Sequence, residues 1–378
     1  MKLDSVHIFA ARRLPQGRYG GSLKGLGAVA LGQAAVEGLL QGETLPRPAK
    51  VFWGLARSHT QGMNPGRSLA IRAGLPLDTS AVTVNMACGS SLQALILAAQ
   101  TAALGESRPL LAGGSEAMSD TPHLLPGLRW GFRMGHREVP DVMHHDGLRC
   151  PVTGLLMGET IERLAAKRGI TRPEADAYAA RSHARAAAAD FRAERLQHPA
   201  LGQDEGIRPG LTEVDLARLA PVFQAGGQVT AGNASGISDG AAALLLGRPG
   251  SHPGHPPLAR LLGFAEAGVD PLDMGEAPVP AVRRLLAQHG LNVRDVDLWE
   301  LNEAFAAQVL VCQHQLDLPD DRLNVAGGGV ALGHPIGASG ARIVVTLIHQ
   351  LHQRGGGLGV ATLGIGGGLG LAVLLEVP

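Results

Sequence analysis

Aromatic residues are scarce in this chain: only 3% of its 378 residues are Phe, Trp or Tyr, although 45% are hydrophobic. The buried interior must therefore be built mainly from Ala, Leu, Val and Gly. The chain is long for one core, which predicts two or three packed units. Its 53 glycines stand between apolar runs, so they indicate tight turns and close backbone approaches, not disorder.

An excess of either charge is also absent. Lys plus Arg and Asp plus Glu each number 33, so the chain has no global basic field for nucleic acid, although a local basic patch for a phosphorylated small molecule stays open. No apolar run reaches the roughly 18 residues that span a bilayer, and residues 1–10 lack the apolar stretch of a signal peptide. We therefore expect a soluble, cytoplasmic protein without nucleic-acid or membrane partners.

Cysteines are few. Cys88, Cys150 and Cys312 are too scattered for a disulfide framework or a Cys-rich zinc site, which favours a reducing compartment and leaves free thiols to explain. His252 and His255 lie in the Pro-rich segment 251–257 and could bind a metal, but the prolines favour an exposed connection. No metal is expected.

Strand-like and helix-like segments alternate, which predicts an α/β architecture. Helices are expected over residues 26–40 and 90–104, and strands over 51–55, 82–86 and 110–112, the last ending at Gly113-Gly114. The C-terminal part repeats this plan with a helix over 340–351, a turn over 355–359 and a strand over 360–363. This weak repeat indicates two similar halves.

The middle of the chain follows a different plan. Residues 121–154 have no clean period and are interpreted as irregular loop, while residues 172–195 predict an Ala- and Arg-rich helix that Thr171 can cap. We interpret residues 119–228 as an inserted lobe. The N-terminal half then comprises residues 1–118 and 229–256, and the C-terminal half comprises residues 257–378.

A candidate nucleophile lies in segment 83–92 (TVNMACGSSL), where Cys88 stands between an expected strand and an expected helix. The positive end of a helix dipole lowers a thiol pKa and favours the thiolate. A small buried residue in a tight turn is the equally balanced alternative.

His334 is the candidate base, in the Gly-rich segment 327–341 (GGGVALGHPIGASGA). Its ordinary pKa of about 6.5 suits it to take a proton from a thiol. A lone His in such a turn is more often structural, but a cysteine nucleophile elsewhere reverses the balance.

Two further segments can stabilise charge. Asn302 and Glu303, in segment 302–305 (NEAF), can orient a water or a charged intermediate, although in isolation capping of the following helix is favoured. The amides of segment 364–370 (GIGGGLG) can stabilise an oxyanion, with a plain tight turn as the alternative. A phosphate loop is excluded because the Lys-Ser/Thr ending is missing.

With these four segments the chain resembles the thiolases, the family of CoA-dependent acetyltransferases and 3-ketoacyl-CoA cleaving enzymes. Segments 62–65 (GMNP), 157–160 (MGET) and 229–239 (VTAGNASGISD) extend the resemblance in the expected order. It implies two similar βαβ-rich halves in a five-layered α-β-α-β-α arrangement around a central helix pair. An inserted loop domain would hold CoA.

The resemblance also implies roles for single residues. Cys88 would accept the acyl group and His334 would activate it. Asn302, through a water, would form one oxyanion hole with His334, and the amides of Cys88 and Gly366 would form the other. Five residues match positions that line the pantetheine channel or active site: Met157, Ala231, Ser235, Ala304 and Phe305. CoA would be substrate or product, no other cofactor is implied, and the assembly would be a homodimer or homotetramer.

One departure bears on the chemistry. Thiolases normally carry a second cysteine where this chain has Gly364. That thiol deprotonates the attacking acetyl-CoA carbon in condensation and protonates the leaving enolate in cleavage. Its loss predicts impaired carbon–carbon bond chemistry, since a positioned acid or base typically contributes about 10²- to 10⁴-fold.

Three interpretations follow from Gly364. The chain is a thiolase with weak or rescued carbon–carbon chemistry, or an acyl-CoA hydrolase or acyltransferase without that step, or an idle CoA-binding subunit. The combination of Cys88, His334 and Asn302 argues against the idle subunit. Cys312 is expected in the core, and nothing in the sequence places Cys150 near Cys88.

Overall fold

The computed structural model describes residues 1–41 and 47–378. Its strands are β1 (Lys2–Arg13), β2 (Gly17–Arg18), β3 (Lys50–Gly54), β4 (Ser80–Val84), β5 (Leu110–Ala117), β6 (Ser238–Gly247), β7 (Ala259–Gly268), β8 (Leu298–Leu301), β9 (Gly357–Ile365) and β10 (Leu369–Val377). The α-helices are α1 (Ala28–Leu40), α2 (Pro65–Arg72), α3 (Ser90–Ala103), α4 (Met157–Arg168), α5 (Arg172–Ala188), α6 (Glu213–Ala217), α7 (Pro278–His289), α8 (Ala306–Leu316), α9 (Gly329–Leu332) and α10 (Ser339–Gln353).

The described strands form one sheet in the order β4-β3-β5-β6-β1-β7-β10-β9-β8, with β2 paired to β6. β1 joins the two halves because it pairs antiparallel with β6 on one side and with β7 on the other. Each half repeats one plan: a helix (α3 or α10) precedes a strand that runs parallel to its neighbour, and an antiparallel strand follows. This agrees with the predicted repeat.

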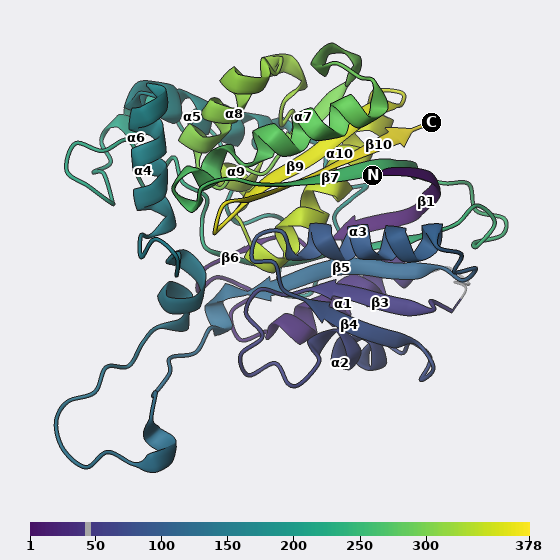
Figure 1. Cartoon of the computed structure of the whole chain (residues 1–378), viewed down its shortest axis with the longest axis horizontal. Coiled ribbons are helices and arrows are strands. Elements are labelled where there is room, and N and C mark those ends of the chain that lie inside the picture. The colour runs from purple at the N-terminus through teal and green to yellow at the C-terminus, as the bar shows by residue number, and fades with distance from the viewer. Residues whose placement is uncertain (42–46) are drawn as a thin grey trace.

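Helices α3 and α10 form the central layer. Their apolar residues share one core with both halves of the sheet, including Leu92, Leu95, Ile343 and Leu347. Helices α1 and α2 cover the outer face of the N-terminal half, and α7 and α8 cover that of the C-terminal half (Figure 1). The five-layered α-β-α-β-α arrangement is therefore confirmed, with the sheet continuous across it.

Tertiary packing changes three local predictions. β5 runs past Gly113 and Gly114 to Ala117, because it pairs with β6 as far as Asp239; the two glycines lie against neighbouring backbone where a Cβ would overlap. α5 begins behind the predicted Thr171 cap but ends at Ala188 instead of Arg195. β9 begins at Gly357, inside the predicted turn.

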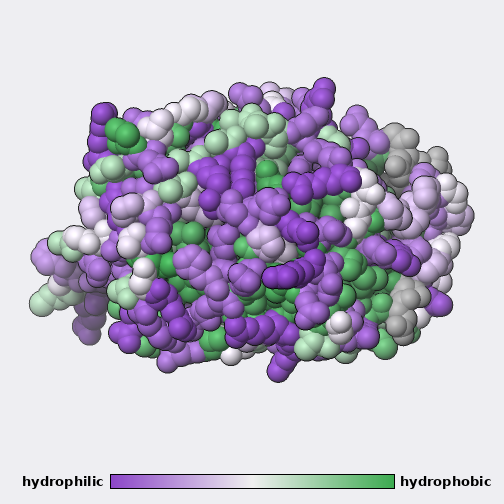
Figure 2. Space-filling view, turned by 90° about the horizontal axis from the view of Figure 1, so that it is seen from above, coloured by the Kyte–Doolittle hydropathy of each residue, from purple (hydrophilic) through white to green (hydrophobic). Residues whose placement is uncertain are grey.

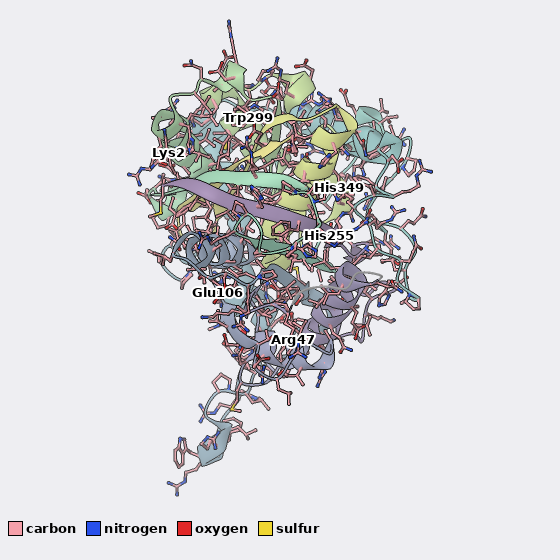
Figure 3. The ribbon with its side chains drawn as sticks, turned by 90° about the vertical axis from the view of Figure 1, so that its right-hand side faces the viewer. Lys2, Arg47, Glu106, His255, Trp299 and His349 are labelled. Carbon is pink, nitrogen blue, oxygen red and sulfur yellow. The ribbon has the colours of Figure 1, made fainter. Side chains whose placement is uncertain are left out.

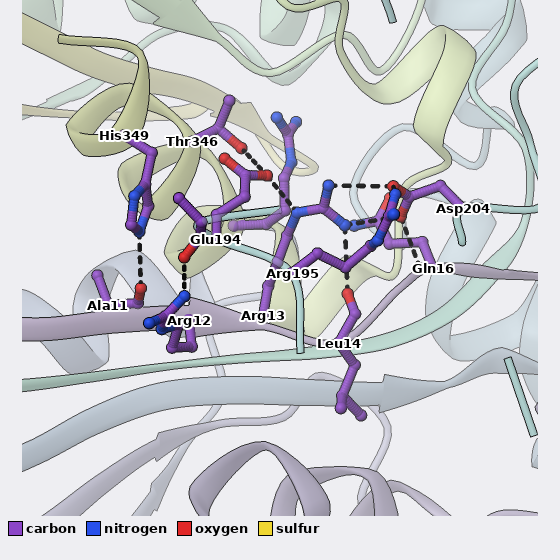
Figure 4. A network of polar contacts seen from close by, with 12 residues as sticks. Ala11, Arg12, Arg13, Leu14, Gln16, Glu194, Arg195, Asp204, Thr346 and His349 are labelled. Atoms are coloured by element: carbon purple, nitrogen blue, oxygen red, sulfur yellow. Dashed lines mark hydrogen bonds and ion pairs between the residues drawn. The ribbon is translucent and has the colours of Figure 1, made fainter. Parts of the chain in front are cut away.

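A buried polar network anchors the inserted lobe to both halves (Figure 4). Arg13 of β1 bonds Glu194 at 2.5 Å and Asp204 at 2.6 Å, and Glu194 accepts a bond from Thr346 of α10. His349 of α10 contacts the carbonyl of Ala11 at 2.9 Å. Breaking such a buried ion network leaves an unpaired charge, so this network holds the lobe in one position. The division at residues 119 and 228 stays a prediction.

Residues 121–140 form an arm that extends away from the body between β5 and α4 (Figures 1 and 3). Figure 2 shows the face of the molecule seen from above, on which hydrophilic and hydrophobic side chains are interspersed. Across residues 1–41 and 47–378, no helix is both long and apolar enough to cross a membrane.

Candidate active site

Cys88 stands in a tight turn between β4 and α3, two residues before the helix begins. Ala87 has a φ of 45°, in the left-handed region that non-glycine residues rarely adopt. Ser90 holds the turn, since its hydroxyl accepts the Met86 N–H at 2.9 Å and donates to the Ala87 carbonyl at 2.7 Å. This strained turn points the chain into α3 immediately after the thiol, as the sequence predicts.

The Gly-rich segment near the C-terminus meets this thiol. It is the β9–β10 hairpin, with φ of 91° at Gly367 and 87° at Gly368, and the N–H of Gly366 faces the Cys88 sulfur. Burial raises the pKa of Cys88, while that N–H, the charge of Arg57 and the residue's own N–H oppose the rise. The segment is therefore a tight turn, as one of its two interpretations expected, and its oxyanion role stays a prediction.

His334 is buried and its ring is oriented by Ser339. Nδ1 lies 2.5 Å from the Ser339 hydroxyl, which itself donates to the Pro335 carbonyl at 2.9 Å. Because that hydroxyl already donates, it accepts from Nδ1–H, and Nε2 carries no proton and could accept one. Burial lowers the pKa of His334 to about 3, with the charges of Arg342 and Arg57 acting in the same direction. The imidazole is therefore neutral at pH 7.

Asn302 lies at the end of β8 and does not cap a helix, because α8 begins only at Ala306 behind Phe305. Its side chain is buried, and both of its polar atoms are without a hydrogen-bond partner in the described part of the chain. Unlike the other predicted site residues, Asn302 does not line the cavity described below.

Glu303 is a buried carboxylate that joins three segments, a role that the helix-cap interpretation missed. It accepts bonds from Tyr178 and Ser182 of α5, each at 2.7 Å, from Asn324 at 3.1 Å and from the Val330 N–H at 3.0 Å. It thereby fixes the Gly-rich segment that carries His334 against the inserted lobe. No sequence signal marked these partners, since they lie more than 20 positions away.

One cavity of about 270 Å³ brings the separate segments together. Its wall includes nine of the residues discussed from the sequence: Cys88, Met157, Ala231, Ser235, Ala304, Phe305, His334, Gly364 and Gly366. The remaining wall is mainly apolar, with Met118, Leu148, Phe223 and Met274 among its residues. A mainly apolar cavity with a few polar groups suits a flexible, largely aliphatic ligand.

Backbone contacts hold these walls in register. The Ser235 N–H donates to the Ala304 carbonyl at 3.0 Å, and the His334 N–H donates to the Gly236 carbonyl at 3.1 Å. Segment 229–239 thus lies between the Asn302 and His334 segments, although it is distant from both in the sequence.

The other two thiols differ in surroundings. Cys312 is buried in the core of the C-terminal half, as expected, and burial raises its pKa to about 12. Cys150 is buried too, but it lies at the Gly-rich hairpin: burial raises its pKa, and bonds from Thr153, Val152 and the Gly367 N–H outweigh that effect. The sequence had offered no reason to place Cys150 near the Cys88 turn. Its side chain does not line the cavity.

The histidines of segment 251–257 form no metal centre with other groups: no cluster of three or more His, Cys, Asp or Glu able to hold a metal occurs among the described residues. His255 is exposed and stacks on His252 with ring centroids 3.8 Å apart. His252 is buried against Phe9, so the prediction of a solvated loop is wrong for this residue.

Comparisons with known proteins identify the family. Residues 6–249 match the family model described as "Thiolase, N-terminal domain" and residues 255–377 match "Thiolase, C-terminal domain". The chain is 45% identical to an acetyl-CoA acetyltransferase of Chromobacterium violaceum, over 99% of this chain and 100% of the relative. It is 42% identical to a probable acetyl-CoA acyltransferase of Staphylococcus aureus, over 99% of each.

Solved structures show the same fold. Human mitochondrial 3-ketoacyl-CoA thiolase in complex with CoA superposes with a TM-score of 0.94 at 38% identity, over 99% of this chain and 98% of that one. An acetyl-CoA acetyltransferase of Syntrophomonas wolfei gives a TM-score of 0.95 at 36% identity, over 99% of each. The chain therefore belongs to the thiolase family and is an enzyme of that class.

Proposed function

We propose that this enzyme transfers acyl groups from acyl-CoA or 3-ketoacyl-CoA through a thioester on Cys88. The observation that carries the proposal is the shared cavity, in which Cys88 and His334 meet the Gly366 N–H. The relatives' names, acetyl-CoA acetyltransferase and 3-ketoacyl-CoA thiolase, support the substrate class.

The first half-reaction needs only groups in this cavity. Nε2 of His334 accepts the Cys88 proton, and the thiolate attacks the thioester carbonyl. The carbonyl oxygen gains negative charge, which the N–H groups of Cys88 and Gly366 can stabilise. The carbon–sulfur bond to CoA then breaks, and the CoA sulfur takes the proton from His334. Asn302 would act through a water with His334 at the second oxyanion position.

The carbon–carbon step has fewer suitable groups. When a 3-ketoacyl-CoA is cleaved, the leaving carbon must be protonated, and in condensation a proton must be removed from that carbon. Of the described residues that line the cavity, Cys88 and His334 are the ones with ionisable side chains. We infer that Gly364 slows this step and leaves acyl transfer to and from Cys88 largely intact.

The CoA moiety would lie along the apolar wall of the cavity. Met157, Ala231, Ser235, Ala304 and Phe305 line it and are proposed to contact the pantetheine arm. CoA is substrate or product in this scheme, and the reaction requires no further cofactor. The three free thiols also favour a cytoplasmic, reducing location.

The test compares 3-ketoacyl-CoA thiolysis by the parent, Gly364→Cys and Gly364→Ala, over several acyl lengths. Residue 364 does not have a positive φ, and a Cβ there would lie 3.0 Å from the Met274 carbonyl oxygen and 3.5 Å from Pro278. A cysteine therefore fits with a small adjustment. We expect Gly364→Cys to be about 10²-fold faster or more, because it restores a positioned acid or base. Gly364→Ala adds the same Cβ without a thiol and should stay as slow as the parent.

A parent that cleaves 3-ketoacyl-CoA at an ordinary enzymatic rate, with no gain in Gly364→Cys, would show that another group moves the proton. If both proteins are slow but release CoA from acyl-CoA, the second candidate function is supported: an acyl-CoA hydrolase or acyltransferase without carbon–carbon chemistry. That candidate rests on the missing side chain of Gly364. If no variant forms an acyl-enzyme yet CoA binds in calorimetry, the chain is a CoA-binding subunit.

A further inference from the structure

The most unusual group near the active site is the buried guanidinium of Arg57. It follows β3, and its side chain is only 3% exposed. None of its three side-chain nitrogens has a hydrogen-bond partner within the described residues. Most buried polar groups in proteins are hydrogen-bonded, so an arginine in this state requires a reason other than stability.

Arg57 faces the acidic group Glu116 at the end of β5. Nη1 of Arg57 lies 3.9 Å from Oε2 of Glu116, too far for a hydrogen bond but close for opposite charges. Glu116 accepts three backbone bonds, from Ala56 at 3.1 Å, Arg57 at 3.2 Å and Gly337 at 2.8 Å. Gly337 follows His334 by three positions, so Glu116 joins the Arg57 loop to the loop of the proposed base.

Arg57 also contacts the cavity wall. A Cβ on residue 147 would overlap the terminal nitrogen Nη2 of Arg57, so the guanidinium lies directly against Gly147. Gly147 lines the same cavity as Cys88 and His334. Next to Gly147 in the chain, the charged group is the carboxylate of Asp146. It lies 3.2 Å from His59 and 2.5 Å from His145. Arg342, which is paired with Glu300 at 3.1 Å, acts from the side of His334.

We propose that Arg57 is a positioning residue of the acyl-transfer site, whose guanidinium braces the wall at Gly147 and, opposed by Glu116, provides positive charge beside the Cys88 thiol. The inference rests on the proposed function of Cys88. In this proposal Arg57 stabilises the Cys88 thiolate and Glu116 destabilises it.

The direction of the electrostatic effects supports this assignment. Burial is the main influence and raises the pKa of Cys88; Arg57 lowers it and Glu116 raises it. For His334, burial and the charge of Arg57 both lower the pKa, which favours the neutral ring that can accept a proton. A cation at this position therefore favours the thiolate of Cys88 and the neutral ring of His334.

The experiment is the pH dependence of Cys88 alkylation by iodoacetamide, followed by mass spectrometry in the folded protein. In Arg57→Met we expect the midpoint to rise by about one pH unit, or about tenfold slower alkylation at a fixed pH below it. Arg57→Lys keeps a cation and should restore most of the parent value. Glu116→Gln keeps the shape and an acceptor oxygen, and should shift the midpoint downward. Arg67→Met, which removes a helix α2 arginine bonded to the carbonyls of Leu77 and Thr79, serves as the control without a shift.

A merely structural role would not give shifts of opposite sign. Folded Arg57→Met with the parent midpoint, or shifts of the same sign in Arg57→Met and Glu116→Gln, would overturn the inference. Should Arg57→Met not fold, Gly147→Ala displaces the guanidinium without removing it and should also raise the midpoint. If Cys88 of the parent reacts no faster than Cys150 or Cys312, the proposed function itself fails. If Cys88 reacts faster than both but Arg57→Met leaves the midpoint of its alkylation unchanged, only the role of Arg57 fails.

Discussion

At the scale of single residues, burial holds the side chains of His334 and His183 in their neutral state. Burial lowers the pKa of His334 to about 3, and burial together with the charge of Arg208 lowers that of His183 to about 4. His183 accepts the Arg208 N–H on Nδ1 at 3.1 Å, a bond that only the neutral ring can accept there. Both rings lose their proton on folding, which costs stability whenever the unfolded chain would bind it.

His183→Asn should make the protein less sensitive to acid. The unfolded ring titrates near pH 6.5 and the folded ring near 4, so below pH 6.5 the unfolded state binds more protons and stability falls as pH falls. Asn keeps an acceptor and does not titrate. We expect the free energy of unfolding of the parent to drop, relative to the variant, by about 2 kcal/mol between pH 6.5 and 5. Urea unfolding at both pH values measures these free energies. If the difference between parent and variant is the same at pH 6.5 and pH 5, the prediction is contradicted.

At the scale of elements, the cavity depends on one helix approaching one loop closely. Gly158 lies in the first turn of α4, and a Cβ there would overlap the ring of Phe223. Both Phe223 and the adjacent Met157 line the cavity. Only glycine lets α4 and this aromatic wall come so close.

Gly158→Ala should therefore displace the Phe223 ring and narrow or distort the cavity. Overpacking typically costs about 1–3 kcal/mol, so CoA affinity should fall by about tenfold, with a smaller free energy of unfolding. Calorimetry measures the affinity for CoA, and urea unfolding measures the free energy of unfolding. Gly202→Ala is the matched control, because a Cβ at that position meets no atom within 4 Å and its φ is not positive. CoA affinity equal to that of the parent would exclude this role for Gly158.

At the scale of the whole molecule, the arm of residues 121–140 is the feature that a single chain does not explain. It exposes large apolar side chains, with Trp130 87% and Met134 89% exposed, and Leu125, Leu128 and Val139 near half. Exposed apolar groups gathered on one projection are typical of protein interfaces. We infer that the arm contributes to the homo-oligomer, dimer or tetramer, which the resemblance implies.

The double variant Trp130→Ser, Met134→Ser should assemble less than the parent in sedimentation velocity at micromolar concentration. The reason is the loss of the apolar area that would be buried between copies. Leu104→Ser removes an apolar residue that is 89% exposed at the end of α3, away from the arm, and should assemble like the parent. A parent that sediments as a monomer would refute the assembly, and an unaffected double variant would refute the role of the arm.

The sequence by itself determined the α/β class, several of the strands and helices, the resemblance to the family and the candidate chemical groups; it did not predict β1, which joins the two halves. Alternating apolar segments predicted the strands and helices because their periods are local properties. The residue types of Cys88 and His334 and the glycines beside them made both residues candidates, and the resemblance to the thiolases assigned their roles.

Tertiary structure alone decided where those groups meet. Gly366 reaches the Cys88 sulfur, Glu303 joins α5 to the His334 segment, and Cys150 contacts the same hairpin, all through contacts between residues far apart in the chain. Arg57 in sequence is an ordinary arginine after a strand; only packing buries it against Gly147 and Glu116. The physical reason is that burial and charge pairing depend on distances across the fold, which residue order alone does not specify.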